Sequence, residues 1–129
     1  PTRTPLPTLT STPAPVFNIS YTSLDTCTGW WTEFKIKNTG SVEFRSVEIK
    51  VQDVDTAVVL SNLTDGFTDL TGCLTSTKKD VLTPGNSLIV SAPAFMYDPT
   101  GHTIRATVTM CSNTGQSGLC VTKKIEFKP

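Results

Sequence analysis

The chain of 129 residues has little histidine and no excess of charge of either sign. Its 11 basic side chains balance its 11 acidic ones, so it presents no basic field of the kind that attracts nucleic acid or anionic lipid. No apolar run approaches the roughly 20 residues that a membrane-spanning helix requires. We therefore expect no nucleic-acid partner and no membrane span.

Catalytic motifs are missing as well. The single histidine, His102, has no nucleophile at a known spacing, and the sequence contains no G-x-S-x-G, no H-E-x-x-H and no phosphate-binding glycine loop. Two carboxylate pairs remain, Asp53 with Asp55 and Asp65 with Asp69. They flank turns, where the Asp side chain hydrogen-bonds to the backbone. A calcium site using Asp65 and Asp69 stays open as an alternative, because flexible loops can offer Ca²⁺ several oxygens. We predict a protein that is not an enzyme and that has no cofactor.

Four cysteines are present, at Cys27, Cys73, Cys111 and Cys120. None of them forms a C-x-x-C pair, and His102 has no ligand partner at a recognisable spacing, so we predict no metal site. In a small β-rich chain, four cysteines instead indicate two disulfides and an oxidising compartment.

No proline occurs between Pro15 and Pro84, yet five of the first 15 residues are proline. Proline, threonine and serine make up most of residues 1–15, which predicts an extended, polyproline-like arm joined to one domain at residues 16–129. Its hydroxyls resemble an O-glycosylated stalk and make glycosylation candidates of Thr2, Thr4, Thr8, Thr10, Ser11 and Thr12. An extended arm can add to a sheet edge or fill a groove in a neighbouring copy. The residues expected to make that contact are Pro5, Leu6, Pro7, Leu9, Pro13 and Pro15.

Alternating apolar and polar residues after the arm predict β-strands. In the segment 30–37, Trp30, Phe34 and Ile36 share one face, which we expect to be buried, while Trp31 projects from the other. The turn 38–41 follows, and a strand is predicted over 42–52. Its apolar residues change parity near Arg45, which predicts a β-bulge at 45–46.

Further strands are predicted at 56–60 and 87–91, and the clearest pair is a closing hairpin formed by 104–110 and 121–127. Cys111 and Cys120 lie at the two feet of the hairpin loop. Both side chains fall on the outward face by parity, which favours a Cys111–Cys120 disulfide. Cys27–Cys73 follows by elimination, although four cysteines allow three connectivities.

About seven short strands, turns at regular intervals and no convincing helix predict an all-β fold. We expect an immunoglobulin-like antiparallel sandwich of two sheets carrying the extended arm. The segments Phe34–Val42, with its Asn-Thr-Gly, and Leu82–Ser87, with its Leu-x-Pro-Gly-x-Ser, resemble the pattern of Ig-like modules in bacterial and archaeal cell-surface and extracellular proteins. The resemblance covers residues 30–90. Such modules serve as spacers, adhesins, filament subunits and carbohydrate-binding accessories.

Three surface features complete the prediction. Trp31, as an exposed aromatic contact, is expected to be covered by the arm, to stack on a sugar or to anchor a protein contact. Local or intersubunit covering ranks first, because one aromatic ring makes a poor sugar platform. Asn18-Ile19-Ser20 and Asn62-Leu63-Thr64 are N-glycosylation sequons, which makes Asn18 and Asn62 candidates, although short sequons also arise by chance.

These patterns together predict a secreted, non-catalytic structural protein. We expect a subunit of a self-assembling surface filament, in which copies of the chain are partners because the arm packs on a neighbour. The alternative is a carbohydrate-binding or adhesive module of a larger cell-surface protein, with glycans as partners and the arm as a linker. A glycan-binding module requires a monomer with a mobile arm, whereas the filament requires self-association.

Overall fold

The computed structural model describes residues 13–74 and 76–129, which contain nine β-strands and no helix. Of the arm, only Pro13 to Pro15 are described. Ten predicted arm residues therefore lie outside the described residues, namely Thr2, Thr4, Pro5, Leu6, Pro7, Thr8, Leu9, Thr10, Ser11 and Thr12.

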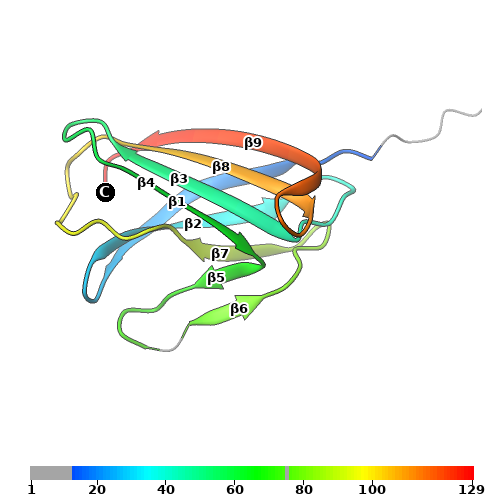
Figure 1. Ribbon diagram of the computed structural model, residues 1–129, viewed down its shortest axis with the longest axis horizontal. Coiled ribbons are helices and arrows are strands. Elements are labelled where there is room, and N and C mark those ends of the chain that lie inside the picture. The colour runs from blue at the N-terminus through cyan, green and yellow to red at the C-terminus, as the bar shows by residue number, and fades with distance from the viewer. Residues whose placement is uncertain (1–12, 75) are drawn as a thin grey trace, which may run out of the picture.

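Seven of the strands form two antiparallel sheets that pack face to face (Figure 1). The first sheet has the order β1-β2-β7 and contains β1 (Phe17–Thr26), β2 (Trp30–Asn38) and β7 (Ser87–Ser91). The second has the order β4-β3-β8-β9 and contains β4 (Val59–Asp65), β3 (Ser46–Asp53), β8 (Ile104–Asn113) and β9 (Ser117–Phe127). A small third sheet pairs β5 (Phe67–Asp69) with β6 (Thr77–Lys79).

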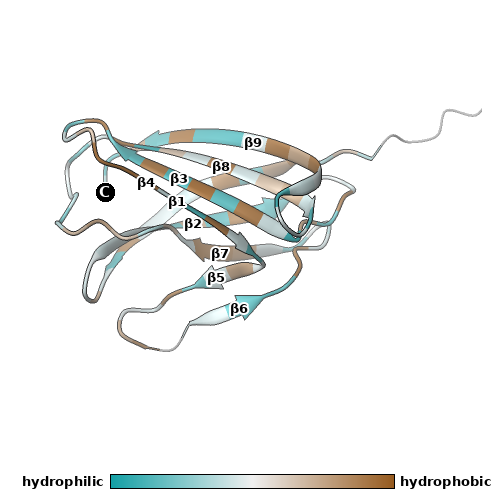
Figure 2. Cartoon of the chain, in the orientation of Figure 1, coloured by the Kyte–Doolittle hydropathy of each residue, from teal (hydrophilic) through white to brown (hydrophobic). Residues whose placement is uncertain are grey.

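The core lies between the two larger sheets. Phe34 and Ile36 of β2 face Val47, Ile49 and Val51 of β3 across it, and all five are buried. The alternation of hydropathy that produces this arrangement is visible along β3 (Figure 2). Fully burying each such side chain stabilises the fold by roughly 1.5–3 kcal/mol. The two-faced strands predicted at 30–37 and 104–110 are confirmed, with Ile104, Ala106, Val108 and Met110 of β8 buried, although Trp30, which we expected on the buried face of β2, is only half-buried.

The sandwich is closed along one side and open along the other. On the closed side, Tyr21 of β1 stacks on Phe127 of β9 with ring centroids 4.3 Å apart, and Phe34 packs edge-on against the same ring. On the opposite side, β4 and β7 are the last strands of their sheets. Figure 1 shows the β5–β6 pair beside this second side.

The predicted strand at 42–52 with its bulge is wrong. β3 begins at Ser46, and its pairing with β4 and with β8 is uninterrupted. Phe44 instead forms an isolated bridge to Leu82, while the amide of Arg45 donates to the carbonyl of Cys111 in the second sheet. The parity changes because the chain passes from one set of partners to another between Phe44 and Ser46.

The segment predicted as a strand at 56–60 begins later, because Ala57 takes a positive φ of 64° in a turn and β4 starts at Val59. The closing hairpin is confirmed, with a turn of only three residues between Asn113 and Ser117. Both predicted disulfides are also confirmed. Cys111 and Cys120 are directly paired in the β8–β9 register, and Cys27 is bonded to Cys73.

Candidate functional site

The end of the arm is bound to the turn that follows β2. The amides of Thr39 and Gly40 both donate to the carbonyl of Val16 at 3.1 Å, and the amide of Ser41 donates to the carbonyl of Ala14 at 3.1 Å. In return, the amide of Ala14 donates to Oγ of Ser41 at 3.0 Å. These four hydrogen bonds fix the point from which the arm leaves the domain. We call residues 14–16 together with turn 39–41 the arm anchor.

Gly40 is required in the anchor for space. A Cβ at this position would collide with the carbonyl oxygen of Ala14 and lie 2.8 Å from the amide nitrogen of Val16. Its φ does not lie in the positive range, unlike that of Gly85 in the Pro-Gly turn. The backbone of the arm therefore approaches the turn more closely than any other residue would allow.

Asn38, which has no exposed surface, joins the two segments that carry the Ig-like resemblance. Its side-chain amide donates to the carbonyls of Val42 at 2.8 Å and Leu82 at 3.1 Å, and its Oδ1 accepts from the Gly40 amide. Its backbone carbonyl accepts from the amide of Gly85. The Asn-Thr-Gly turn and the Pro-Gly turn therefore lie together at the end of the sandwich where β1 begins.

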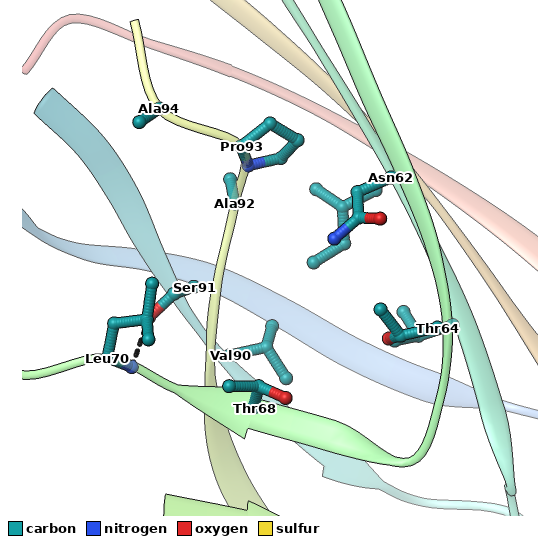
Figure 3. Close-up of a pocket in the computed structure, with 11 residues that line it drawn as sticks. Asn62, Thr64, Thr68, Leu70, Val90, Ser91, Ala92, Pro93 and Ala94 are labelled. Carbon is teal, nitrogen blue, oxygen red and sulfur yellow. Dashed lines mark hydrogen bonds between the residues drawn. The ribbon is translucent and has the colours of Figure 1, made fainter. Parts of the chain in front are cut away.

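A groove of about 220 Å³ opens along the unclosed side, between β4 and β7 (Figure 3). Its wall and floor are apolar where Val47 and Ile49 of β3 meet Val90 of β7. Its rim is polar but uncharged, since Asn62 and Thr64 of β4 lie opposite Thr68 of β5. Leu70, Ser91, Ala92, Pro93 and Ala94 complete the lining, in which no side chain carries a charge.

The four outer strands of the two sheets differ in how they are protected. β9 carries Lys123 and Lys124, charged residues that discourage pairing with another chain, and β1 has a register shift at Tyr21. β7 is only five residues long. β4 contains no proline, no register shift and no charge before Asp65, and its outward-facing Val59 and Leu63 are exposed. β4 is therefore the edge best suited to pairing with an added strand.

A second cluster surrounds Asp53, which ends β3 and has no exposed surface. Its Oδ2 accepts from Tyr97 Oη at 2.7 Å and pairs with His102 Nδ1 at 2.6 Å. Its Oδ1 accepts from the amides of Asp55 at 2.9 Å and Thr56 at 3.3 Å. The hydroxyl of Thr56 donates to Tyr97, because the hydrogen of the phenol is directed at Asp53. Asp53 thus joins the end of β3 to the loop before β8.

The charges in this cluster follow from these contacts. Burial alone would raise the pKa of Asp53, but hydrogen bonds from His102, Tyr97 and two amides outweigh it and lower that pKa to about 2. The pKa of His102 is raised above its usual value, mainly by the hydrogen bond to Asp53. At a pH between these values the pair is ionic, with Asp53 negative and His102 positive.

Among the described residues, this cluster also contains the group of side chains that could hold a metal ion. Asp53, Asp55 and His102 can each place one ligand atom within 4.8 Å of the others. Both oxygens of Asp53 already accept hydrogen bonds, so a cation would first have to displace His102 or Tyr97. In the described part of the chain, the imidazole of His102 contacts Asp53 and is not hydrogen-bonded to a nucleophilic side chain. The arrangement suits a structural tie better than catalysis.

Sequence reasoning assigned Asp53 and Asp55 to turn structure, and the amide contacts of Asp53 agree with that. It missed the tie to His102, because the partners are separated by 49 residues and have no motif spacing. The other carboxylate pair is directed to different neighbours. Asp65 accepts from the amide of Gly115 at 2.7 Å, whereas Asp69 lies near Asp25, where burial and that charge raise the pKa of Asp69.

The prediction that Trp31 is an exposed contact residue is wrong, because only 4% of its surface is exposed. It does lie on the outer face of β2, where its indole nitrogen donates to Glu33 at 3.3 Å. The segment after β5 crosses this face: the amide of Leu70 donates to Ser91, and that of Gly72 donates to Asp25, the register partner of Trp31. The Cys27–Cys73 disulfide holds the segment there.

The candidate N-glycosylation sites Asn18 and Asn62 are both exposed, on the edge strands β1 and β4. Asn62 also lines the groove. The arm residues Pro13 and Pro15 are exposed and half-buried, respectively.

Comparisons with family models, with curated proteins and with solved structures found no match to this chain. No helix among the described residues is long and apolar enough to cross a membrane. The two disulfides point to an oxidising compartment outside the cytosol.

Proposed function

We propose that the chain is a non-catalytic structural subunit of an extracellular, self-assembling surface filament, in which the arm of each copy packs on the next. The arm anchor is the observation that supports this proposal most strongly. Four hydrogen bonds hold residues 14–16 against the turn at 39–41, so the described end of the arm has a fixed position at one end of the sandwich. A binding segment with a fixed base loses less entropy on binding than a free tail does.

The order of the strands supports an Ig-like reading of the fold within this proposal. Setting β5 and β6 aside, the first, second and fifth strands share one sheet, and the remaining four share the other. In the immunoglobulin fold, strands A, B and E lie in one sheet and C, F and G in the other, with C′ added beside C in variable-type domains. β4 corresponds to C′ in this scheme.

Repeated contact between an arm and a different surface of the next copy is heterologous. Such contacts build an open filament unless the rotation between copies closes a ring. In Figure 1 the described residues that precede β1 lie at one end of the sandwich and the C-terminus lies toward the other, an arrangement that suits head-to-tail stacking.

The alternative is an adhesive or carbohydrate-binding module joined in series to other domains of a surface protein. The placement of the two described ends favours a module in series to the same degree. Burial of Trp31 removes the aromatic platform that a sugar would stack on, which counts against the glycan-binding form of this alternative.

Negative-stain electron microscopy of the full chain beside a variant lacking residues 1–12 tests the proposal. This deletion spares Ala14 and Val16, so the domain keeps its anchor and its fold, which circular dichroism checks. We expect filaments from the full chain and dispersed particles from the variant. Dispersed monomers in both samples would favour the module in series. Filaments in both would show that residues 1–12 do not form the contact between copies.

A further inference from the structure

We infer that the groove between β4 and β7 is the acceptor for the arm, and that residues 8–12 of one copy add as a strand along the free edge of β4 of the next, with Leu9 seated in the groove. This inference rests on the proposed function and specifies the contact behind it. The occupant is a segment of a second copy of this chain.

The acceptor offers two kinds of contact at one place. The outer edge of β4 carries backbone donors and acceptors that no strand of the described structure pairs with, since β4 is the last strand of its sheet. Beside this edge, the apolar side chains of Val47, Ile49 and Val90 line about 220 Å³ of space, room for about seven waters at ~30 Å³ each. An added strand that places an apolar side chain there gains both backbone hydrogen bonds and burial.

The arm contains one segment with matching properties. Prolines at positions 5, 7 and 13 cannot donate to a ladder, but residues 8–12, Thr-Leu-Thr-Ser-Thr, keep all five amides. Threonine is favoured in strands because its side chain is branched at Cβ. Side chains alternate along a strand, so when Leu9 faces the groove, Thr8 and Thr10 face outward. Leu9 is the only large apolar residue in the segment.

Charge complements this match. None of the residues that line the groove is charged, and residues 1–15 contain a single charged side chain, Arg3. The amide of Asn62 lies at the rim and can donate to a carbonyl of the arm. An acidic or basic tail would lose hydration in this groove without gaining a partner, whereas the uncharged segment 8–12 would not.

Strand order makes a neighbouring copy the better donor. The anchor precedes β1, which is the far edge of its sheet from β7, and β4 is the far edge of its sheet from β9. Residues 14–16 therefore lead into the edge strand farthest from β7, whereas the groove lies between β7 and β4. The 12 residues before Pro13 reach at most roughly 37 Å at about 3.1 Å each, enough to leave one body and follow the seven residues of β4 on another.

Sedimentation velocity on the full chain, made in a host that does not glycosylate Asn62, tests the inference. On the arm, Leu9→Asp and Thr10→Pro are compared with Thr4→Pro, a matched proline substitution outside the proposed strand. On the acceptor, Asn62→Lys is compared with Leu119→Lys, an exposed residue of β9, the edge strand on the other side of the sheet from β4. Thr68→Lys charges the opposite wall and provides a second acceptor variant. Thermal unfolding confirms that each variant is folded.

We expect Leu9→Asp, Thr10→Pro, Asn62→Lys and Thr68→Lys each to weaken self-association by at least about tenfold, and both controls to change it less than about threefold. If the arm variants disrupt assembly but the two acceptor variants do not, the arm binds elsewhere; the groove is then overturned while the proposed function stands. If only the acceptor variants disrupt assembly, β4 pairs with another strand and the arm is not the occupant. A wild-type chain that remains monomeric contradicts both proposals.

Discussion

Asp53 is buried at the end of β3, and its two oxygens accept from Tyr97, His102 and the amides of Asp55 and Thr56. A buried carboxylate with this many donors remains charged, which accounts for its pKa of about 2. Removing one donor leaves the charge buried with one partner fewer, and that costs more than the hydrogen bond itself contributes.

Tyr97→Phe is therefore expected to lower the free energy of unfolding by roughly 1–3 kcal/mol, because it removes the phenol that donates to Asp53 and accepts from Thr56. Chemical denaturation measures the change. Tyr21→Phe is the matched control, since Tyr21 contributes its ring to the stack on Phe127 and should lose little. Equal effects of the two substitutions would show that the Asp53 cluster adds no particular stability.

The same cluster predicts a dependence of stability on pH. Asp53 has a depressed pKa, so its contribution is present above its ordinary 3.8 and is lost as the pH falls toward about 2. His102 has a raised pKa, so its contribution is complete below 6.5 and is lost as the pH rises through the raised value. The pair should therefore contribute most between about pH 4 and 6.5.

His102→Asn tests this by difference. The unfolding free energies of wild type and variant should be furthest apart between about pH 4 and 6.5 and should converge on the alkaline side, as His102 loses its proton in the wild type. Measurements from pH 2 to 9 are sufficient. A difference that stays constant, or that grows above pH 7, is incompatible with an ionic His102–Asp53 pair.

At the scale of elements, alternation in the sequence predicted the strands that build the core, and it failed where a partner is distant. Phe34 and Ile36 are buried as their spacing indicates, and the parity of Cys111 and Cys120 identified their bond. Trp31 is on the predicted face, yet it is buried, and the segment hydrogen-bonded to its register partner Asp25 lies about 40 residues further along the chain, which no local pattern reveals.

The remaining errors have the same origin. The parity change near Arg45 has two physical explanations, a bulge within one strand or a change of pairing partners between Phe44 and Ser46, and the local sequence is identical in both. The groove is formed by β3, β4, β5 and β7, so it became visible only when the sheets were placed. One signal was available: residues 59–64 form an uncharged run without proline, typical of an unprotected edge.

The arm anchor leaves no space for a side chain at position 40. Gly40→Ala should release residues 14–16, because its Cβ collides with the carbonyl of Ala14. We expect hydrogen exchange of the Thr39 and Ser41 amides to accelerate by at least about tenfold, equivalent to about 1.4 kcal/mol. Ser41→Ala, which removes only the side-chain bond to Ala14, should have a smaller effect at Thr39. Unchanged protection in Gly40→Ala would contradict the anchor.

The two disulfides should differ in their contribution to stability, because they close loops of different length. Cys27–Cys73 spans 46 residues and Cys111–Cys120 spans nine. The chain-entropy relation assigns about 4 kcal/mol to the longer loop and about 2.6 kcal/mol to the shorter. Replacing each pair by alanine and measuring chemical denaturation compares them. A greater loss from the Cys111–Cys120 pair would mean that strain or residual structure, not loop length, dominates.

At the scale of the whole molecule, the sandwich is closed on one side by aromatic stacking between β1 and β9 and left open on the other between β4 and β7. Residues 14–16 of the anchor lead into β1, and the open edge is formed by β4 and β7. A subunit whose two contact surfaces differ can associate head to tail without using the same surface twice, which is the requirement for an open filament.

The most direct test of arm binding is a cross-link between the arm of one copy and the groove of another. Benzoyl-phenylalanine in place of Leu9 is introduced into unlabelled chain, mixed with ¹⁵N-labelled wild-type chain, irradiated and analysed by mass spectrometry. We expect cross-links from position 9 to labelled peptides containing β4 or β7. Cross-links confined to the unlabelled chain's own residues, or to labelled peptides outside the groove, would contradict this expectation.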